Sequence, residues 1–393
     1  MSEQPPVRIQ VLDGFRAVAI LLVIGFHWFV RWAPPWSSTG AQPWGDILAD
    51  VWLLKFGRTH ACFFFILSGF VILLTLERCR GFPDFFRKRV ARLWPTLVVC
   101  ALLTTAILYA VGKSEWTRGP LSIFLSTLMI DPAALRPLFP GLDLGWVDGA
   151  YWTLAVEARF YILVGLIYLV GRKLFLPVWL GIQAVSFAMG SPWLAGVDAL
   201  EPLRLVLMPI WLPYLTLGIC LFEVYRTGRW PLLPTLGAVA SALMILVNAY
   251  AWSRFAFEDP LGRTMVNAGW IALSVLFVVR SPLVKPFAWK PLVWLGGISY
   301  PLFLLHEAGG MGLMQPLRAI GLHPVAIFVI VSFAMIALSF LIFRFVEEPA
   351  KNRILNATKS TVATLSQRAP WLDYRRPADA PATVSHGRAS SAP

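Results

Sequence analysis

The sequence predicts an all-α membrane protein, a polytopic helix bundle with about ten transmembrane spans. Of its 393 residues, 58% are hydrophobic and only 14% are charged. A soluble chain of this length would need about a quarter of its residues charged to cover its surface. Apolar stretches of about 20 residues, the length that crosses the hydrocarbon core, recur along nearly the whole chain. These stretches lack the short alternation of polar and apolar residues that is typical of a transmembrane β-barrel.

The predicted spans form a single membrane domain over residues 1–350. They lie at roughly residues 14–32, 60–77, 93–112, 151–171, 174–190, 204–223, 232–252, 265–281, 291–311 and 324–346. From residue 351 the composition shifts to Ala, Pro, Ser and Arg, and such a segment cannot bury a hydrophobic core. We therefore expect residues 351–393 to form a disordered cytoplasmic tail.

Basic residues predict the orientation of the spans. Lys and Arg are enriched in cytoplasmic loops, and short loops report this most reliably. The segment from Arg78 to Arg92 is short and densely basic. We therefore place it, the N-terminus and the C-terminus in the cytoplasm, in a multi-pass protein of the plasma (inner) membrane. The net charge of +13 then reflects topology and attraction to anionic lipid or ligand, and it does not indicate a nucleic-acid partner.

The cysteines give no sign of a disulfide framework. Cys62, Cys79, Cys100 and Cys220 are scattered along the chain without a CxxC pair. This spacing predicts membrane-buried or cytoplasmic thiols, and it offers no zinc or other metal site.

Ionisable residues inside predicted spans are costly in hydrocarbon, so each is a candidate functional group. Arg16 and His27 lie in the first span, eleven residues apart. At about 100° per residue this separation is about three helical turns, so both side chains project from nearly the same face, with His27 about 16 Å deeper in the membrane. The pattern suits an anion-binding Arg below a titratable imidazole. A snorkelling Arg and a structural His would produce it as well.

Two later spans carry further ionisable residues. Glu157 lies about two turns below the outer surface, where a carboxylate needs a partner or water. It is either a functional acid or half of a structural ion pair.

In the ninth span, the glycines at 296 and 297 permit close helix packing and Pro301 frees a backbone carbonyl. His306 follows in the outer half of that span, and its position favours a structural over a catalytic role.

Two further features lie near the side predicted to face the cytoplasm. The second span contains Ser68-Gly69, a pair that is commonly a simple helix contact. The basic loop after it closes with Arg89-Val-Ala-Arg92-Leu-Trp-Pro95. Such a loop is ordinarily a cytoplasmic marker, but it would also form a good cradle for phosphate groups.

Five motifs occur in a fixed order along the chain: LDGFRAVAILLVIGFH, which contains Arg16-x10-His27; FFFILSGF; R-x-x-R-x-x-P, from Arg89 to Pro95; YWTLAVEARFY; and ISYPLFLLHE. Together they resemble the acyltransferase-3 family of integral membrane acyltransferases, over residues 10–347. The resemblance implies an enzyme that moves an acyl group, usually acetyl, from acyl-CoA to a hydroxyl of an extracytoplasmic or membrane-embedded acceptor. It implies no permanently bound cofactor, since acetyl-CoA is a donor substrate.

The same resemblance assigns roles to particular residues. It marks Arg16 and His27 as functional, with His27 as the catalytic histidine. The donor-site elements that it implies are Ser68, Arg87, Arg89 and Arg92. The donor's phosphates would stay at this basic mouth, because the Arg fork pairs phosphate oxygens bidentately. Its pantetheine arm would reach His27, which then acts as a general base on the acceptor hydroxyl or accepts the acyl group transiently.

For the acceptor side we predict that Glu157 assists His27 and that Tyr151, Trp152 and His306 bind the acceptor. Aromatic rings at the outer mouth stack on sugars, although Trp and Tyr also form the ordinary interfacial belt. The favoured acceptor is a surface polysaccharide or lipid-linked glycan, with a small metabolite as the other candidate. A transporter or flippase of a glycolipid or small anion, in which His27, Glu157 and His306 relay protons, is the alternative from another functional class.

Overall fold

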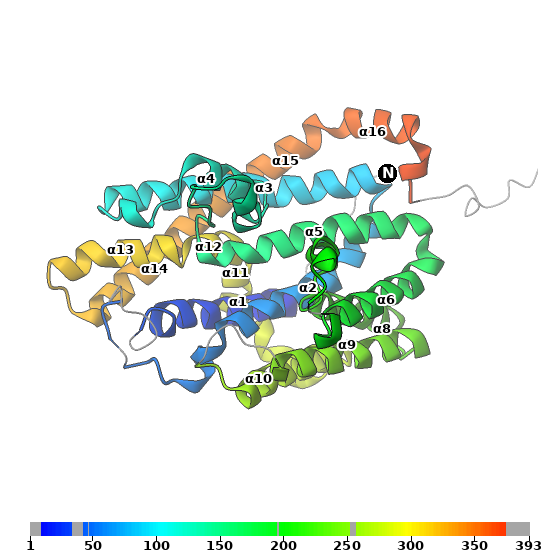
Figure 1. Ribbon diagram of the computed structural model, residues 1–393, viewed down its shortest axis with the longest axis horizontal. Coiled ribbons are helices and arrows are strands. Elements are labelled where there is room, and N and C mark those ends of the chain that lie inside the picture. Colours follow the sequence, from blue (N-terminus) through cyan, green and yellow to red (C-terminus); the bar gives the residue numbers. More distant parts are fainter. Residues whose placement is uncertain (1–8, 34–41, 46, 195, 252–256, 375–393) are drawn as a thin grey trace, which may run out of the picture.

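The structure is a computed structural model, and it describes residues 9–33, 42–45, 47–194, 196–251 and 257–374. Within these ranges the regular structure is helical, apart from one isolated β-bridge between Gly81 and Asp373. Figure 1 shows the long helices lying side by side as a bundle. The predicted all-α membrane fold is confirmed. The four cysteines are free and buried, as their spacing predicted.

Eight helical segments in the described ranges are long and apolar enough to cross a membrane. Their helices are α1 (Gln10–Gly25), which continues into a π-helical turn (Phe26–Val30), α2 (Gly57–Leu76), α3 (Phe82–Ala110), α5 (Trp152–Ile167), α7 (Glu201–Leu207) with α8 (Leu212–Thr227), α9 (Leu232–Ala251), α10 (Pro260–Val278) and α14 (Pro324–Ile342) with α15 (Glu348–Ala357). The remaining helices include α4 (Pro120–Thr127) and α16 (Lys359–Arg368).

Two of the ten predicted spans fall outside these eight segments. The stretch at 174–190 is helix α6 (Arg172–Met189), which packs beside α5, α8 and α9. It is shorter than the neighbouring spans and begins with two basic residues. The count of ten continuous spanning helices is therefore not confirmed by length and composition.

The predicted span at 291–311 is wrong as one continuous helix. It consists of α11 (Lys290–Gly297), α12 (Ser299–Leu305) and α13 (Ala308–Ala319). Pro301 explains the first break, because a proline ring clashes with the carbonyl group four residues earlier in a helix. The second break falls at His306 and Glu307, just before two consecutive glycines, which are poor helix formers.

Glycines allow the central helices to approach closely. A Cβ atom on Gly69 of α2 would lie 2.0 Å from the carbonyl oxygen of Leu215 in α8, and one on Gly296 of α11 would lie 1.9 Å from the carbonyl oxygen of Asp13 in α1. Real Cβ atoms cannot sit at those distances, so each contact requires a residue without a side chain. The predicted packing role of these glycines is confirmed.

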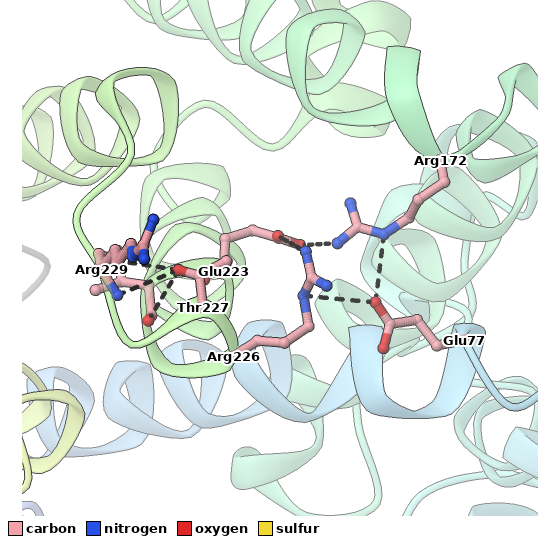
Figure 2. Close-up of polar contacts among 7 residues, drawn as sticks. Glu77, Arg172, Glu223, Arg226, Thr227 and Arg229 are labelled. Atoms are coloured by element: carbon pink, nitrogen blue, oxygen red, sulfur yellow. Dashed lines mark hydrogen bonds and ion pairs between the residues drawn. The ribbon is translucent and has the colours of Figure 1, made fainter.

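An ion-pair network joins the ends of three helices that were predicted to face the cytoplasm. Figure 2 shows Arg172, at the start of α6, between Glu77 of α2 and Glu223 of α8. Arg226 of α8 lies 2.9 Å from Glu223 and 3.9 Å from Glu77. The loops that were predicted to share one side of the membrane therefore lie at the same end of the bundle.

The predicted disorder of the tail is wrong for its first part, because α15 and α16 run through residues 351–368 along α3. Arg87 of α3 donates to the carbonyl oxygen of Leu355 at 2.9 Å, and Arg80 pairs with Asp373 at 3.2 Å. Composition alone missed this order, because the helices are held by α3 and not by a core of their own. Residues 375–393 lie outside the described ranges.

Candidate active site

His27 sits where α1 changes its winding. The last turn, Phe26–Val30, is π-helical, so each turn holds an extra residue. Such turns occur frequently at functional sites. They rotate one side chain out of the regular helical register. The carbonyl oxygen of Trp28 accepts a hydrogen bond from Nε1 of Trp44 at 2.7 Å, which helps to hold the turn.

The second break in the ninth predicted span lies next to this turn. A broken helix leaves carbonyl groups without their usual donors, which is costly away from water. Here side chains supply the donors: Nε1 of Trp28 donates to the His306 carbonyl oxygen at 2.7 Å, and the Tyr151 hydroxyl donates to the Leu304 carbonyl oxygen at 3.2 Å. The break is therefore stabilised by hydrogen bonds from the π-helical turn after α1 and from the residue just before α5.

The break brings a carboxylate to His27. Nδ1 of His27 lies 3.1 Å from Oε1 of Glu307, and the two side chains are only 14% and 7% exposed. A carboxylate on this side favours the tautomer in which Nδ1 carries the proton, so Nε2 keeps its lone pair. A buried imidazole with a free Nε2 lone pair is equipped to take a proton from a hydroxyl group.

His306 lies on the other side of His27, with ring centroids 5.0 Å apart. Its Nδ1 donates to the Phe303 carbonyl oxygen at 2.8 Å, so its Nε2 carries no proton. This Nε2 is buried and has no hydrogen-bond partner within the part of the chain that the structure describes. His306 is therefore placed beside His27 with a free acceptor atom, which is a suitable position for contact with an acceptor hydroxyl.

A second polar cluster surrounds Arg16. Nη1 of Arg16 lies 3.2 Å from Oδ1 of Asp13, and Arg92 and Glu157 are among its charged neighbours. The Ser68 hydroxyl donates to Oε1 of Glu157, which ties α2 to α5. The structure thus brings the predicted donor-site residues Arg16, Ser68 and Arg92 together, and it places Glu157 with them.

Two other arginines of the basic segment, Arg87 and Arg89, have structural partners. Arg89 is 7% exposed, donates to the Thr75 hydroxyl, and lies 5.2 Å from the centre of the Tyr161 ring. Arg87 pairs with Asp84 at 2.8 Å. By contrast, Arg92 makes no hydrogen bond or ion pair within the described residues, so its guanidinium is available to an anion.

The predicted acceptor-binding aromatics take different positions. Tyr151 is fully buried, and its hydroxyl is used by the helix break. Trp152 is only partly buried, with its ring 5.6 Å from the ring of Trp211, and the Arg58 guanidinium lies 4.8 Å from its centre. Of the two, Trp152 is the one placed to meet a ligand.

The carboxylate beside His27 is thus Glu307 and not the predicted Glu157. Within the described residues, no contact joins Glu157 to His27 or His306. No role was predicted for Glu307, the last residue of the motif ISYPLFLLHE. The available signal was two adjacent ionisable residues inside an apolar stretch, one residue before a pair of glycines.

Residues 9–344 match the family described as an acyltransferase domain, Acyl_transf_3. The chain belongs to this acyltransferase family. It is an O-acyltransferase of the membrane, since its relatives carry O-acetyltransferase names and its helices are apolar. No solved structure matches the chain.

Three curated relatives illustrate the family. The chain is 24% identical to an O-acetyl transferase of Shigella phage Sf6, over 70% of this chain and 78% of that protein. It is 27% identical to the acyltransferase MdmB of Streptomyces mycarofaciens, over 61% and 63%. It is 24% identical to the peptidoglycan O-acetyltransferase OatA of Listeria monocytogenes serovar 1/2a, over 88% and 57%. The match therefore spans less than two thirds of the second and third of these relatives.

Proposed function

We propose that this protein transfers an acetyl group from cytoplasmic acetyl-CoA to a hydroxyl group of a surface polysaccharide or lipid-linked glycan. The observation that carries the proposal is the buried His27–Glu307 pair, in which His27 follows Arg16 on the helical segment made of α1 and its π-helical turn. One end of α1 thereby offers a base, and the other end offers a cation for phosphate.

The charges of two arginines support a binding site for the donor. Arg16 and Arg92 lie near each other at the end of the bundle that carries the basic segment, and Arg92 has no partner among the described residues. Guanidinium groups bind phosphate oxygens well because their donors form a planar fork. With the nucleotide held there, a pantetheine arm about as long as the rise from Arg16 to His27, ~16 Å, brings the thioester to the imidazole.

The reaction then needs one base. Nε2 of His27 takes the proton of the acceptor hydroxyl while the acceptor oxygen bonds to the thioester carbonyl carbon. The carbon–sulfur bond breaks, and the leaving CoA thiolate takes that proton from His27. Glu307 stabilises the transient imidazolium through Nδ1. Atoms and charges balance without another reactant.

The relatives support a glycan as acceptor. The Listeria protein is named for peptidoglycan, and the phage protein is named as an O-acetyl transferase. Trp152, at the start of α5, and Nε2 of His306 would meet the sugar from the outer side. The protein would lie in the plasma (inner) membrane with both termini in the cytoplasm, so that donor and acceptor approach from opposite sides.

Replacing the base tests the proposal. His27→Ala should lower acetyl transfer by about 10²–10⁴-fold, because a general base contributes that much to the rate. Acetyl-CoA binding should stay near the parental value, since Arg16 and Arg92 are unchanged. The assay is transfer of radiolabelled acetyl-CoA in membranes that contain equal amounts of each variant. His323→Ala, which removes an exposed histidine at the start of α14, is the control. Parental turnover in His27→Ala would refute the role of His27.

A further inference from the structure

A second carboxyl group lies behind the His27–Glu307 pair. Asp148 is 1% exposed and lies just before α5, in residues 113–150, which we call the outer segment because the topology prediction places it outside. Its Oδ1 accepts a hydrogen bond from the amide of Ala150 at 2.9 Å, and its Oδ2 accepts one from the amide of Ala308 at 2.8 Å. Ala308 directly follows Glu307. These bonds attach the outer segment to the helix break that carries Glu307.

The Glu307 side chain reaches the same place. Its Oε2 atom lies 2.5 Å from the point that a Cβ atom on Gly149 would occupy, so Gly149 leaves the room that this oxygen needs. Oε2 is buried, and it has no hydrogen-bond partner among the residues that the structure describes. A buried carboxylate oxygen without a donor is costly. The neighbouring group able to supply a donor is Asp148, provided that it carries a proton.

The electrostatic surroundings favour a protonated Asp148. The charged and titratable groups that face this place are Arg31 after α1, Cys100 of α3, Tyr151 before α5, and His27 and His306. Two adjacent carboxyl groups in a buried site repel each other when both are ionised, so the pair retains one proton. Burial and the neighbouring Glu307 raise the pKa of Asp148 well above its usual range, against the two backbone amides, which lower it.

We propose that Asp148 is a positioning residue that keeps its proton at neutral pH and donates it in a hydrogen bond to Oε2 of Glu307. Glu307 then stays ionised, with Oε1 held toward Nδ1 of His27. The outer segment thereby orients the base through a carboxylic acid. The effect on turnover rests on the proposed function, whereas the protonation state is a property of the folded protein alone.

Infrared spectroscopy tests the protonation state without turnover. Full-length protein in lipid vesicles at neutral pH is compared with Asp148→Asn, which preserves the Oδ1 acceptor for Ala150. The parent-minus-variant spectrum should show loss of a carbonyl stretch from a protonated carboxylic acid. Asp143→Asn is the matched control, because Asp143 lies in the same outer segment with its side chain 75% exposed and paired to Arg118. It should lose only carboxylate bands. A carboxylate band lost from Asp148→Asn would overturn the proposal.

The pH profile of acetyl transfer tests the positioning role. Asn is neutral like a protonated Asp and offers a donor to Glu307, although its NH2 group cannot accept from the Ala308 amide. Because no charge is removed, the acid midpoint of Asp148→Asn should stay within about half a pH unit of the parent, whereas removing an ionised neighbour would shift it by about a unit or more. Asp148→Ala, which lacks the donor, should be about 10- to 100-fold slower than Asp148→Asn. In a Glu307→Gln background that difference should vanish, and its persistence would contradict action through Glu307. If the parent transfers no acetyl group, the proposed function fails, and the infrared result still decides the state of Asp148.

Discussion

Glu307 contacts the Nδ1 side of His27, and glutamine can imitate its shape but not its charge. Glu307→Gln should lower the rate of acetyl transfer by about 10²-fold or more, because the imidazolium that forms in the reaction loses its anionic partner. Acetyl-CoA affinity should stay parental. Turnover and binding are measured in membranes with matched protein levels, with Glu115→Gln as the control, since that side chain is 57% exposed. Equal turnover in both variants would remove Glu307 from the mechanism.

Arg89 and Arg92 belong to one sequence motif but should behave differently. Arg92 has no partner in the described residues, so Arg92→Gln should weaken acetyl-CoA binding by about 1.5–3 kcal/mol, the value of a charge-assisted contact, with little effect on thermal stability. Arg89 is buried beside Tyr161 and bonds to Thr75, so Arg89→Gln should lower thermal stability first. Titration with acetyl-CoA and with dephospho-CoA, together with melting curves, separates the two effects. Loss of donor affinity in Arg89→Gln alone would reverse the assignment.

Single residues were predicted only where spacing carries information. Arg16 and His27 lie on one continuous helical segment, but a π-helical turn holds His27, so the 3.6-residue periodicity gives only their approximate relation. Glu307 reaches His27 only because the helix breaks beside it and α12 packs near α1, which no local pattern encodes. Glu157 was predicted to need a polar partner, but that partner, Ser68, comes from another helix. Contacts between residues far apart in the sequence could not be predicted from local patterns.

At the scale of helices, close packing of α1 on α11 depends on a missing side chain. Gly296→Ala puts a methyl group against the backbone of α1, at Asp13, so it should destabilise the protein by about 1–3 kcal/mol or more. Gly269→Ala is the matched control, because a Cβ atom at this α10 position meets nothing within 4 Å; it should be neutral or stabilising by up to ~1 kcal/mol. Thermal inactivation of both variants measures the difference. Equal melting temperatures would show that the helices can separate at little cost.

The length of the apolar stretches predicted that these segments are helices, but it did not predict where the helices are interrupted. Hydropathy treats 291–311 as one span, because it averages over Pro301 and the glycines that break it. The π-helical turn after α1 is equally invisible to a pattern that assumes 3.6 residues per turn. Helices α15 and α16 were missed for the opposite reason: their composition is polar, and α3 supplies the surface that orders them.

At the scale of the whole molecule, separate contacts place the two ends of the bundle. Figure 2 gathers the ends of α2, α6 and α8 into one ion-pair network. Near the start of α1, Gly14 approaches the carbonyl oxygen of Phe287, so the segment before α11 lies at the end of the bundle where the chain enters α1. At the other end, a Cβ atom on Gly312 of α13 would lie 2.9 Å from Leu108, close to the C-terminal end of α3. The broken segment α11–α12–α13 therefore runs from one end of the bundle to the other.

This path makes a prediction that hydropathy alone cannot make. If the three short helices cross the membrane as one interrupted span, reporter fusions after Arg229 and after Arg280 should both report the cytoplasm. Fusions after Pro140 and after Leu322 should both report the outside. The physical reason is that the carbonyl groups at the His306 break are bonded by Trp28 and Tyr151, so a broken helix is tolerated at membrane depth. Equal signals at Arg280 and Leu322 would mean that the segment does not cross. His27 and Glu307 would then not meet between donor and acceptor sides, and a transmembrane transfer would lose its structural basis.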